Sequence, residues 1–134
     1  MENPKIGVIS CSGEECLGGT LSRMATRKVM DELRSGEVVS LCLPLYIARG
    51  GEDREFAKKH PVIAVDGCEK CCAKEATIKY SGEVKDAVVI TDLIGDTARD
   101  NEPISMRHLR TNEKDMVDQV AKEICRKVDS IYGR

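Results

Sequence analysis

The chain has 134 residues, the length of one ordinary domain, and 41% of them are hydrophobic, enough for a core. Only 3% are aromatic, with no Trp and a single Phe, so the core must be aliphatic and an aromatic platform for nucleic-acid bases is excluded. The net charge is −2, acids and bases are mixed, and no long apolar run occurs. We therefore expect neither nucleic acid nor a membrane as a partner.

The chain contains seven cysteines, a high and odd number. The first ten residues, MENPKIGVIS, have no apolar stretch long enough for a secretory signal, so we expect a cytoplasmic protein. A disulfide framework is not expected in that reducing compartment. The cysteines are then metal ligands, reactive thiols or small buried hydrophobic residues.

Short apolar segments alternate along the chain with segments of helical periodicity. The expected strands are 5–10, 37–43, 62–66 and 87–91. A first helix follows the first strand, with an apolar stripe of Leu21, Ala25, Val29 and Leu33. Further helices are expected over 53–59, 69–80 and 112–131. The polar stretch 92–110 is compatible with a lid, a partner surface or a loop.

Alternating strands and helices predict an α/β fold with a parallel sheet covered by helices on both faces. Right-handed crossovers make this a small doubly wound sheet of about four strands within a single domain, 1–134. We predict the strand order 2-1-3-4. The order reverses beside the first strand, so a crevice should open at the carboxyl ends of the strands.

Three cysteines distant in sequence fall at this same edge. Cys11 directly follows the first expected strand, Cys42 lies near the end of the second, and Cys68 directly follows the third. Because the carboxyl ends of parallel strands lie on one edge of a sheet, these thiols should gather there. This placement is the strongest functional signal in the sequence.

Two more cysteines, Cys71 and Cys72, follow Cys68 by three and four residues. At a helix start both spacings point to one face, so either could join Cys68 around a metal. Four thiolates suit a tetrahedral zinc ion, and an iron–sulfur cluster also takes four cysteines. A Cys-x-x-Cys pair at a helix start also fits thiol redox chemistry. Spacing alone leaves these alternatives open.

Two phosphate-binding motifs are approached but not met. The segment 13–20, GEECLGGT, resembles a nucleotide-binding loop, but Gly19 stands where the lysine should be. The loop from Cys11 to Cys16 resembles that of low-molecular-weight phosphatases, but it lacks the arginine that holds phosphate. Phosphate and arsenate chemistry are therefore disfavoured.

Several segments together resemble the DGC domain family. They are CSG at Cys11, CL at Cys42, DGCEKCCAK over 66–74, and TDLIG over 91–95. The family is named for its Asp-Gly-Cys motif and is associated with zinc binding through four cysteines. The resemblance implies Cys11, Cys42, Cys68 and Cys72 as zinc ligands. Cys71 and Cys16 are then extra thiols or alternative ligands.

The remaining candidates have structural as well as functional interpretations. Asp66 either accepts hydrogen bonds at the following helix start or supports the cysteine loop around the metal, and Gly67 allows a tight turn or a close approach to it. Cys125 is expected in the core, and His60 at a helix end. Asp92 is either a solvated turn residue or part of the crevice lining.

We therefore predict a zinc-binding protein with a four-cysteine site. The alternatives are a cysteine-based redox or sulfur-transfer protein, with Cys71 as the free thiol, and an iron–sulfur protein. The sequence leaves open a protein partner or a homo-oligomer, and also whether the chain is an enzyme.

Overall fold

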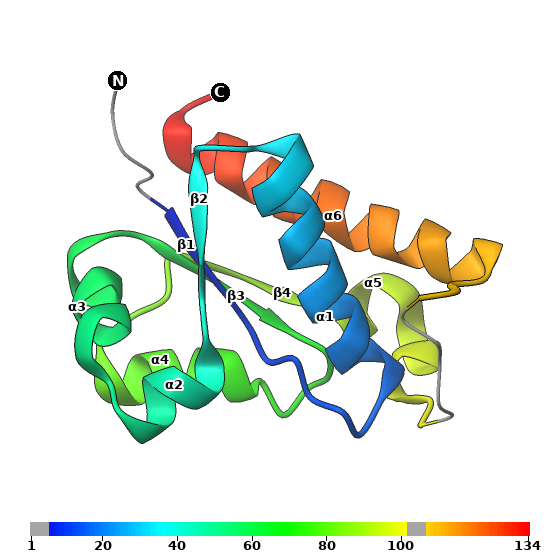
Figure 1. The fold of residues 1–134 in the computed structure, drawn as a ribbon, viewed down its shortest axis with the longest axis horizontal. Coiled ribbons are helices and arrows are strands. Elements are labelled where there is room, and N and C mark those ends of the chain that lie inside the picture. Colours follow the sequence, from blue (N-terminus) through cyan, green and yellow to red (C-terminus); the bar gives the residue numbers. More distant parts are fainter. Residues whose placement is uncertain (1–5, 102–106) are drawn as a thin grey trace.

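Four short apolar segments form the strands of the protein, whose computed structural model describes residues 6–101 and 107–134 (Figure 1). The strands are β1 (Ile6–Ser10), β2 (Val38–Leu41), β3 (Val62–Asp66) and β4 (Asp86–Val89). All pairings are parallel and the order is β2-β1-β3-β4, which confirms the predicted sheet. Every residue of β1 and β3 is buried, as expected for central strands covered on both faces.

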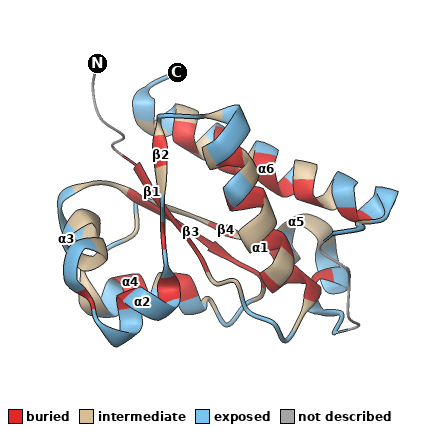
Figure 2. Ribbon diagram, viewed as in Figure 1, coloured by how far each residue is buried: buried red, intermediate tan, exposed pale blue. Residues whose placement is uncertain are grey.

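Helices cover the two faces of the sheet as separate layers (Figure 2). One layer contains α1 (Leu17–Lys28), a π-helical turn η1 (Val29–Leu33), α5 (Ile90–Ile94), the 3₁₀ turn η2 (Gly95–Arg99) and α6 (Thr111–Tyr132). The other contains α2 (Leu43–Ala48), α3 (Gly51–Lys59) and α4 (Cys72–Tyr80). Helices on both faces confirm the doubly wound arrangement.

The register of the sheet brings the carboxyl ends of its strands together. Ile9 of β1 pairs with Leu41 of β2, and Ser10 pairs with Val65 of β3. The residues that follow β1, β2 and β3 therefore emerge at one edge.

Several predicted boundaries were wrong. The second strand ends at Leu41 and not at residue 43, and Leu43 already begins α2. The helix expected over 69–80 begins at Cys72. Leu33, expected in the buried stripe of the first helix, is exposed, because the chain widens there from α-helix into η1.

The polar stretch 92–110 contains most of α5 and all of η2. Residues 102–106 of this stretch lie outside the described part of the chain. Residues 1–5 also lie outside it, and they include the first residue of the first expected strand and the start of the segment in which no secretory signal was expected. Asp92, expected as a turn residue or a crevice residue, is exposed within α5.

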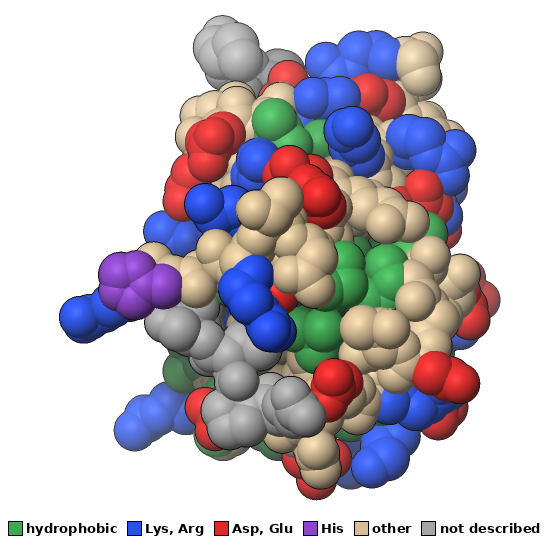
Figure 3. All heavy atoms as spheres, turned by 90° about the vertical axis from the view of Figure 1, so that its right-hand side faces the viewer, with side chains coloured by type: hydrophobic (Ala, Val, Ile, Leu, Met, Phe, Trp, Pro, Cys, Tyr) green, Lys and Arg blue, Asp and Glu red, His purple; other side chains and the backbone are tan. Residues whose placement is uncertain are grey.

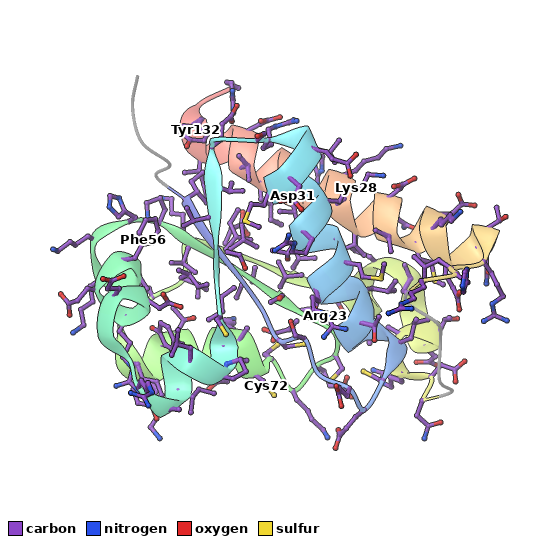
Figure 4. All side chains as sticks on the ribbon, in the orientation of Figure 1. Arg23, Lys28, Asp31, Phe56, Cys72 and Tyr132 are labelled. Carbon is purple, nitrogen blue, oxygen red and sulfur yellow. The ribbon has the colours of Figure 1, made fainter. Side chains whose placement is uncertain are left out.

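The surface carries mixed charge, and Figure 3 shows basic and acidic side chains interspersed over the face that it draws. No helix in the described ranges is long and apolar enough to cross a membrane. Near the end of α6, the Tyr132 hydroxyl, labelled in Figure 4, donates a hydrogen bond to the Glu37 carbonyl at 2.8 Å. This contact ties the last helix to the start of β2.

Candidate functional site

The loop between β3 and α4, residues 67–71, is here named the DGC loop. Asp66, the last residue of β3, connects its two ends because its side chain binds the start of α4. This carboxylate is buried and accepts hydrogen bonds from the backbone N–H groups of Ala73 at 2.7 Å and Lys74 at 3.1 Å. Burial raises the pKa of Asp66, and these two hydrogen bonds oppose that rise. The capping interpretation of Asp66 is confirmed, and the same contacts close the DGC loop.

Cys71 sets the late start of α4. Its backbone is left-handed, with φ of 52°, and its N–H donates to the Cys68 carbonyl at 3.2 Å. Its own carbonyl accepts the N–H of Glu75 at 2.9 Å, the first bond of the helix. Burial raises the pKa of the Cys71 thiol, and the nearby negative charge of Asp66 raises it further. A low-pKa reactive thiol is therefore not what this environment provides.

Gly67 lies in backbone contact with the first turn of α1. A Cβ at Gly67 would lie 2.5 Å from the carbonyl carbon of Gly18 and from the nitrogen of Gly19. A Cβ at Gly18 would lie 2.3 Å from the Gly67 carbonyl oxygen. The glycines of the near-miss phosphate motif thus allow α1 to approach the DGC loop, and only glycine fits there.

The thiol of Cys11 lies between the DGC loop and α1. Its Sγ accepts the Gly67 N–H at 3.3 Å and lies 3.6 Å from the Ser22 hydroxyl oxygen. Ser22 is fully buried, donates to the Gly19 carbonyl at 2.6 Å and accepts the Ser12 N–H at 3.1 Å. Ser22 was not predicted, although its position three residues before the buried Ala25 places it on the inward side of the helix.

Cys72 is the first residue of α4 and is exposed at the carboxyl edge of the sheet (Figure 4). Desolvation raises the pKa of its thiol most, followed by the negative charge of Asp66. The charges of Cys11 and Cys68 raise it further. Cys11, Cys68 and Cys72 all lie in the segments that follow β1 and β3 at this edge, and they are here called the cluster.

Cys42 lies at the same edge but to one side. It is exposed and directly precedes α2, and its backbone N–H donates to the Asp53 carboxylate at 3.1 Å. Helix α2 follows β2 and helix α4 follows β3, and the two helices contact each other. The structure gives Cys42 no described sulfur contact with the cluster.

The other residues singled out from the sequence have separate positions. Cys125 is buried in the core between α1 and α6, as expected. His60 ends α3, and its ring lies 4.4 Å from that of Phe56, between centroids. Cys16 precedes α1 and lines a cavity together with Cys68. All seven cysteines are free thiols.

The residue types at this edge suit a soft metal ion, but their arrangement does not form a metal site. Cysteine thiolates are the preferred ligands of structural zinc. However, within residues 6–101 and 107–134 no three Cys, His, Asp or Glu side chains are arranged to hold a metal ion. The edge therefore gathers thiols without forming a complete coordination shell.

A family model for the DGC domain matches residues 7–124. The chain belongs to the DGC domain family. The match covers the sheet of this DGC domain except for Ile6, and every cysteine except Cys125. A search of curated proteins and a search of solved structures each gave no match.

Proposed function

We propose that this DGC domain binds one zinc ion through the thiolates of Cys11, Cys42, Cys68 and Cys72. The observation that supports it best is the emergence of Cys11, Cys42 and Cys68 from the carboxyl ends of three neighbouring strands. Four sulfur ligands fill a tetrahedral shell and leave no position for water, so the proposed role of the ion is structural and not hydrolytic.

Two hydrogen-bonding groups lie beside the sulfur of Cys11. The Gly67 N–H already points at its Sγ, and the Ser22 hydroxyl lies beside it. Hydrogen bonds of this kind orient metal ligands and tune their charge. In this proposal Gly67 and Ser22 hold Cys11 in place.

Cys72 is preferred to Cys71 as the fourth ligand. The side chain of Cys72 is exposed at the edge, whereas Cys71 has a left-handed backbone whose N–H closes the DGC loop and whose carbonyl begins α4. Binding would require the DGC loop and Cys42 to move closer together. Such coupling between binding and folding is usual for metal sites that are not preformed.

Metal analysis tests the proposal directly. The full chain is purified under reducing conditions without added metal, and its zinc content is measured. We expect about one zinc per chain, and a large loss of zinc in Cys11→Ser, Cys42→Ser, Cys68→Ser and Cys72→Ser. Cys71→Ser is the matched control, because it removes the adjacent thiol and should retain zinc. Zinc well below one per chain in the wild type contradicts the proposal.

The same sample distinguishes the alternative functions. Visible absorption after anaerobic purification would indicate an iron–sulfur cluster, because a zinc protein is colourless. Fast alkylation of Cys71 in metal-loaded protein would favour thiol redox or sulfur-transfer chemistry at that residue. The zinc proposal expects a colourless protein with a slowly labelled Cys71, in a reducing, cytoplasmic setting where the free thiols persist.

A further inference from the structure

A cavity of about 420 Å³ lies between the start of α1, the DGC loop and the end of η2. Its walls include two thiols, Cys16 and Cys68. Its volume is in the range of small-molecule sites in proteins. Cys16 is not one of the four cysteines assigned to zinc, so the cavity has a thiol that the proposed metal site does not use.

The two thiols come from segments that are held together by backbone contact. Cys16 lies two residues before Gly18 and Cys68 directly follows Gly67, and the backbones of these two glycines touch. Cys16 precedes the first turn of α1, where its side chain makes no capping hydrogen bond. Both thiols are half-buried, free and directed to one cavity, so each can meet the same small molecule.

The remaining walls carry two ion pairs, in one of which the DGC loop supplies the cation and in the other the anion. Lys70 of the DGC loop faces Glu15 at 3.6 Å, and Glu69 of the same loop faces Arg99 at 3.3 Å. The side chains of Lys70, Glu15 and Glu69 are largely exposed, and that of Arg99, which also pairs with Asp96, is about half exposed. Each ion pair between exposed groups contributes little and opens at small cost. A ligand that carries both an ammonium and a carboxylate group can replace these partners one for one.

We propose that Cys16 and Cys68 form a thiol–disulfide exchange pair around this cavity, and that its substrates are disulfides of small amino-acid thiols. This inference goes beyond the zinc site and shares only Cys68 with it. The two thiols of the cavity react with the sulfur atoms of the disulfide, and its charged rim recognises the ammonium and carboxylate groups of the ligand.

The exchange takes place in two steps, with the small disulfide as the oxidant. The Cys16 thiolate attacks one sulfur of the disulfide, the S–S bond breaks, and one small thiolate leaves and takes up a proton. The Cys68 thiolate then attacks Sγ of Cys16 in this mixed disulfide. A Cys16–Cys68 bond forms and the second small thiol leaves. The two cysteines are oxidised and one small disulfide is reduced to two thiols.

Cystine is the probe for the test. Reduced, chelator-treated full-length protein is mixed with cystine, quenched in acid and alkylated, and its adducts are located by peptide mass mapping. We expect the first mixed disulfide at Cys16, followed by a Cys16–Cys68 link. Cys68→Ser should accumulate the mixed disulfide at Cys16, and Cys16→Ser should consume cystine roughly tenfold more slowly.

Cys71→Ser is the matched control, since it removes a neighbouring thiol from the same loop and should react like the wild type. Cys16→Ala provides a second replacement, and circular dichroism verifies the fold of each variant. A first adduct at Cys42, Cys71 or Cys72, or no trapped adduct in Cys68→Ser, would overturn the proposal.

The charged rim is tested by comparing cystine with uncharged 2-hydroxyethyl disulfide. The wild type should react faster with cystine, and Lys70→Ala combined with Arg99→Ala should remove that preference. Equal rates in the wild type would overturn the assignment of amino-acid disulfides as substrates.

The outcome is separable from that of the zinc proposal. In zinc-loaded protein, a zinc-bound Cys68 should slow the second step while the mixed disulfide at Cys16 still forms. If no zinc binds, the results with metal-free protein stand unchanged. If zinc binds but no adduct forms at Cys16, only the exchange proposal fails.

Discussion

At the scale of single residues, Gly67 determines how closely the DGC loop approaches α1. Gly67→Ala would place a Cβ 2.5 Å from the backbone of Gly18 and Gly19, which cannot move aside as a flexible side chain can. We expect the free energy of unfolding to fall by about 1–3 kcal/mol, as for other overpacked sites. Urea denaturation measures this change.

Gly13→Ala is the matched control for Gly67→Ala. Gly13 lies in the loop before α1, and a Cβ there would have no atom within 4 Å. Its substitution should leave the unfolding midpoint nearly unchanged. Equal effects of the two substitutions would show that the contact between the DGC loop and α1 is not tight in solution.

Asp66 is the second residue on which the loop depends. Asp66→Ala leaves the N–H groups of Ala73 and Lys74 without their acceptor at a buried helix start. We expect a loss of about 1–3 kcal/mol in the free energy of unfolding. The exposed Asp92 is the control, and Asp92→Ala should change stability by no more than about 0.5 kcal/mol. A stable Asp66→Ala variant would contradict the capping role.

At the scale of elements, Arg34, the residue after η1, is joined to α6 by a bidentate ion pair. Arg34 donates to both carboxylate oxygens of Asp129, at 2.9 Å and 2.7 Å. This bond holds the pKa of Asp129 below its ordinary value. The folded state therefore binds the proton less tightly than the unfolded chain does, so the contribution is present above the unfolded pKa. It is lost as pH falls through the folded pKa.

Asp129→Asn tests this linkage through its pH dependence. We expect the variant to be less stable than the wild type at pH 7, by less than about 1 kcal/mol because the pair is partly exposed. The difference should shrink as the pH falls below about 4. Thermal unfolding over a pH series measures it, with Asp115→Asn, at an exposed position of α6, as control. A constant difference at all pH values would contradict the assignment.

The ends of elements were harder to predict than their centres, for reasons that are visible in particular residues. Nothing in the sequence from Glu69 to Cys71 opposes a helix. However, Cys71 adopts a left-handed backbone, and α4 begins only at Cys72, where Asp66 binds N–H groups of the first turn. The apolar run through Leu43 reads as strand, but Pro44 at the first turn of α2 marks a helix start. That proline was the available signal.

At the scale of the whole molecule, strand order could be predicted because alternating elements and right-handed crossovers leave few arrangements. The order then placed Cys11, Cys42 and Cys68 at one edge. The backbone contact of Gly18 with Gly67 could not be predicted, because it joins segments whose distance depends on the completed packing. The cavity lined by Cys16 and Cys68 also joins segments distant in sequence, and it could not be predicted for the same reason.

The proposed zinc site should also determine global stability, because it would connect the ends of β1, β2 and β3 through one ion. A ligand that binds only the folded state stabilises it by mass action, by about 2.7 kcal/mol at a free concentration one hundred times its dissociation constant. We therefore expect chelator to lower the thermal unfolding midpoint of the purified protein, and added zinc to restore it.

Cys42→Ser isolates the contribution of the ion in this experiment. Cys42 is exposed and its only described contact to α3 is made by its backbone, so the substitution itself should cost little in metal-free protein. With chelator present, wild type and variant should unfold at nearly the same temperature. With zinc, only the wild type should gain the full increment, since the variant lacks one of four sulfur ligands. An equal zinc-dependent increment in both proteins would remove Cys42 from the site and leave the cluster of Cys11, Cys68 and Cys72 without a ligand from the segment after β2.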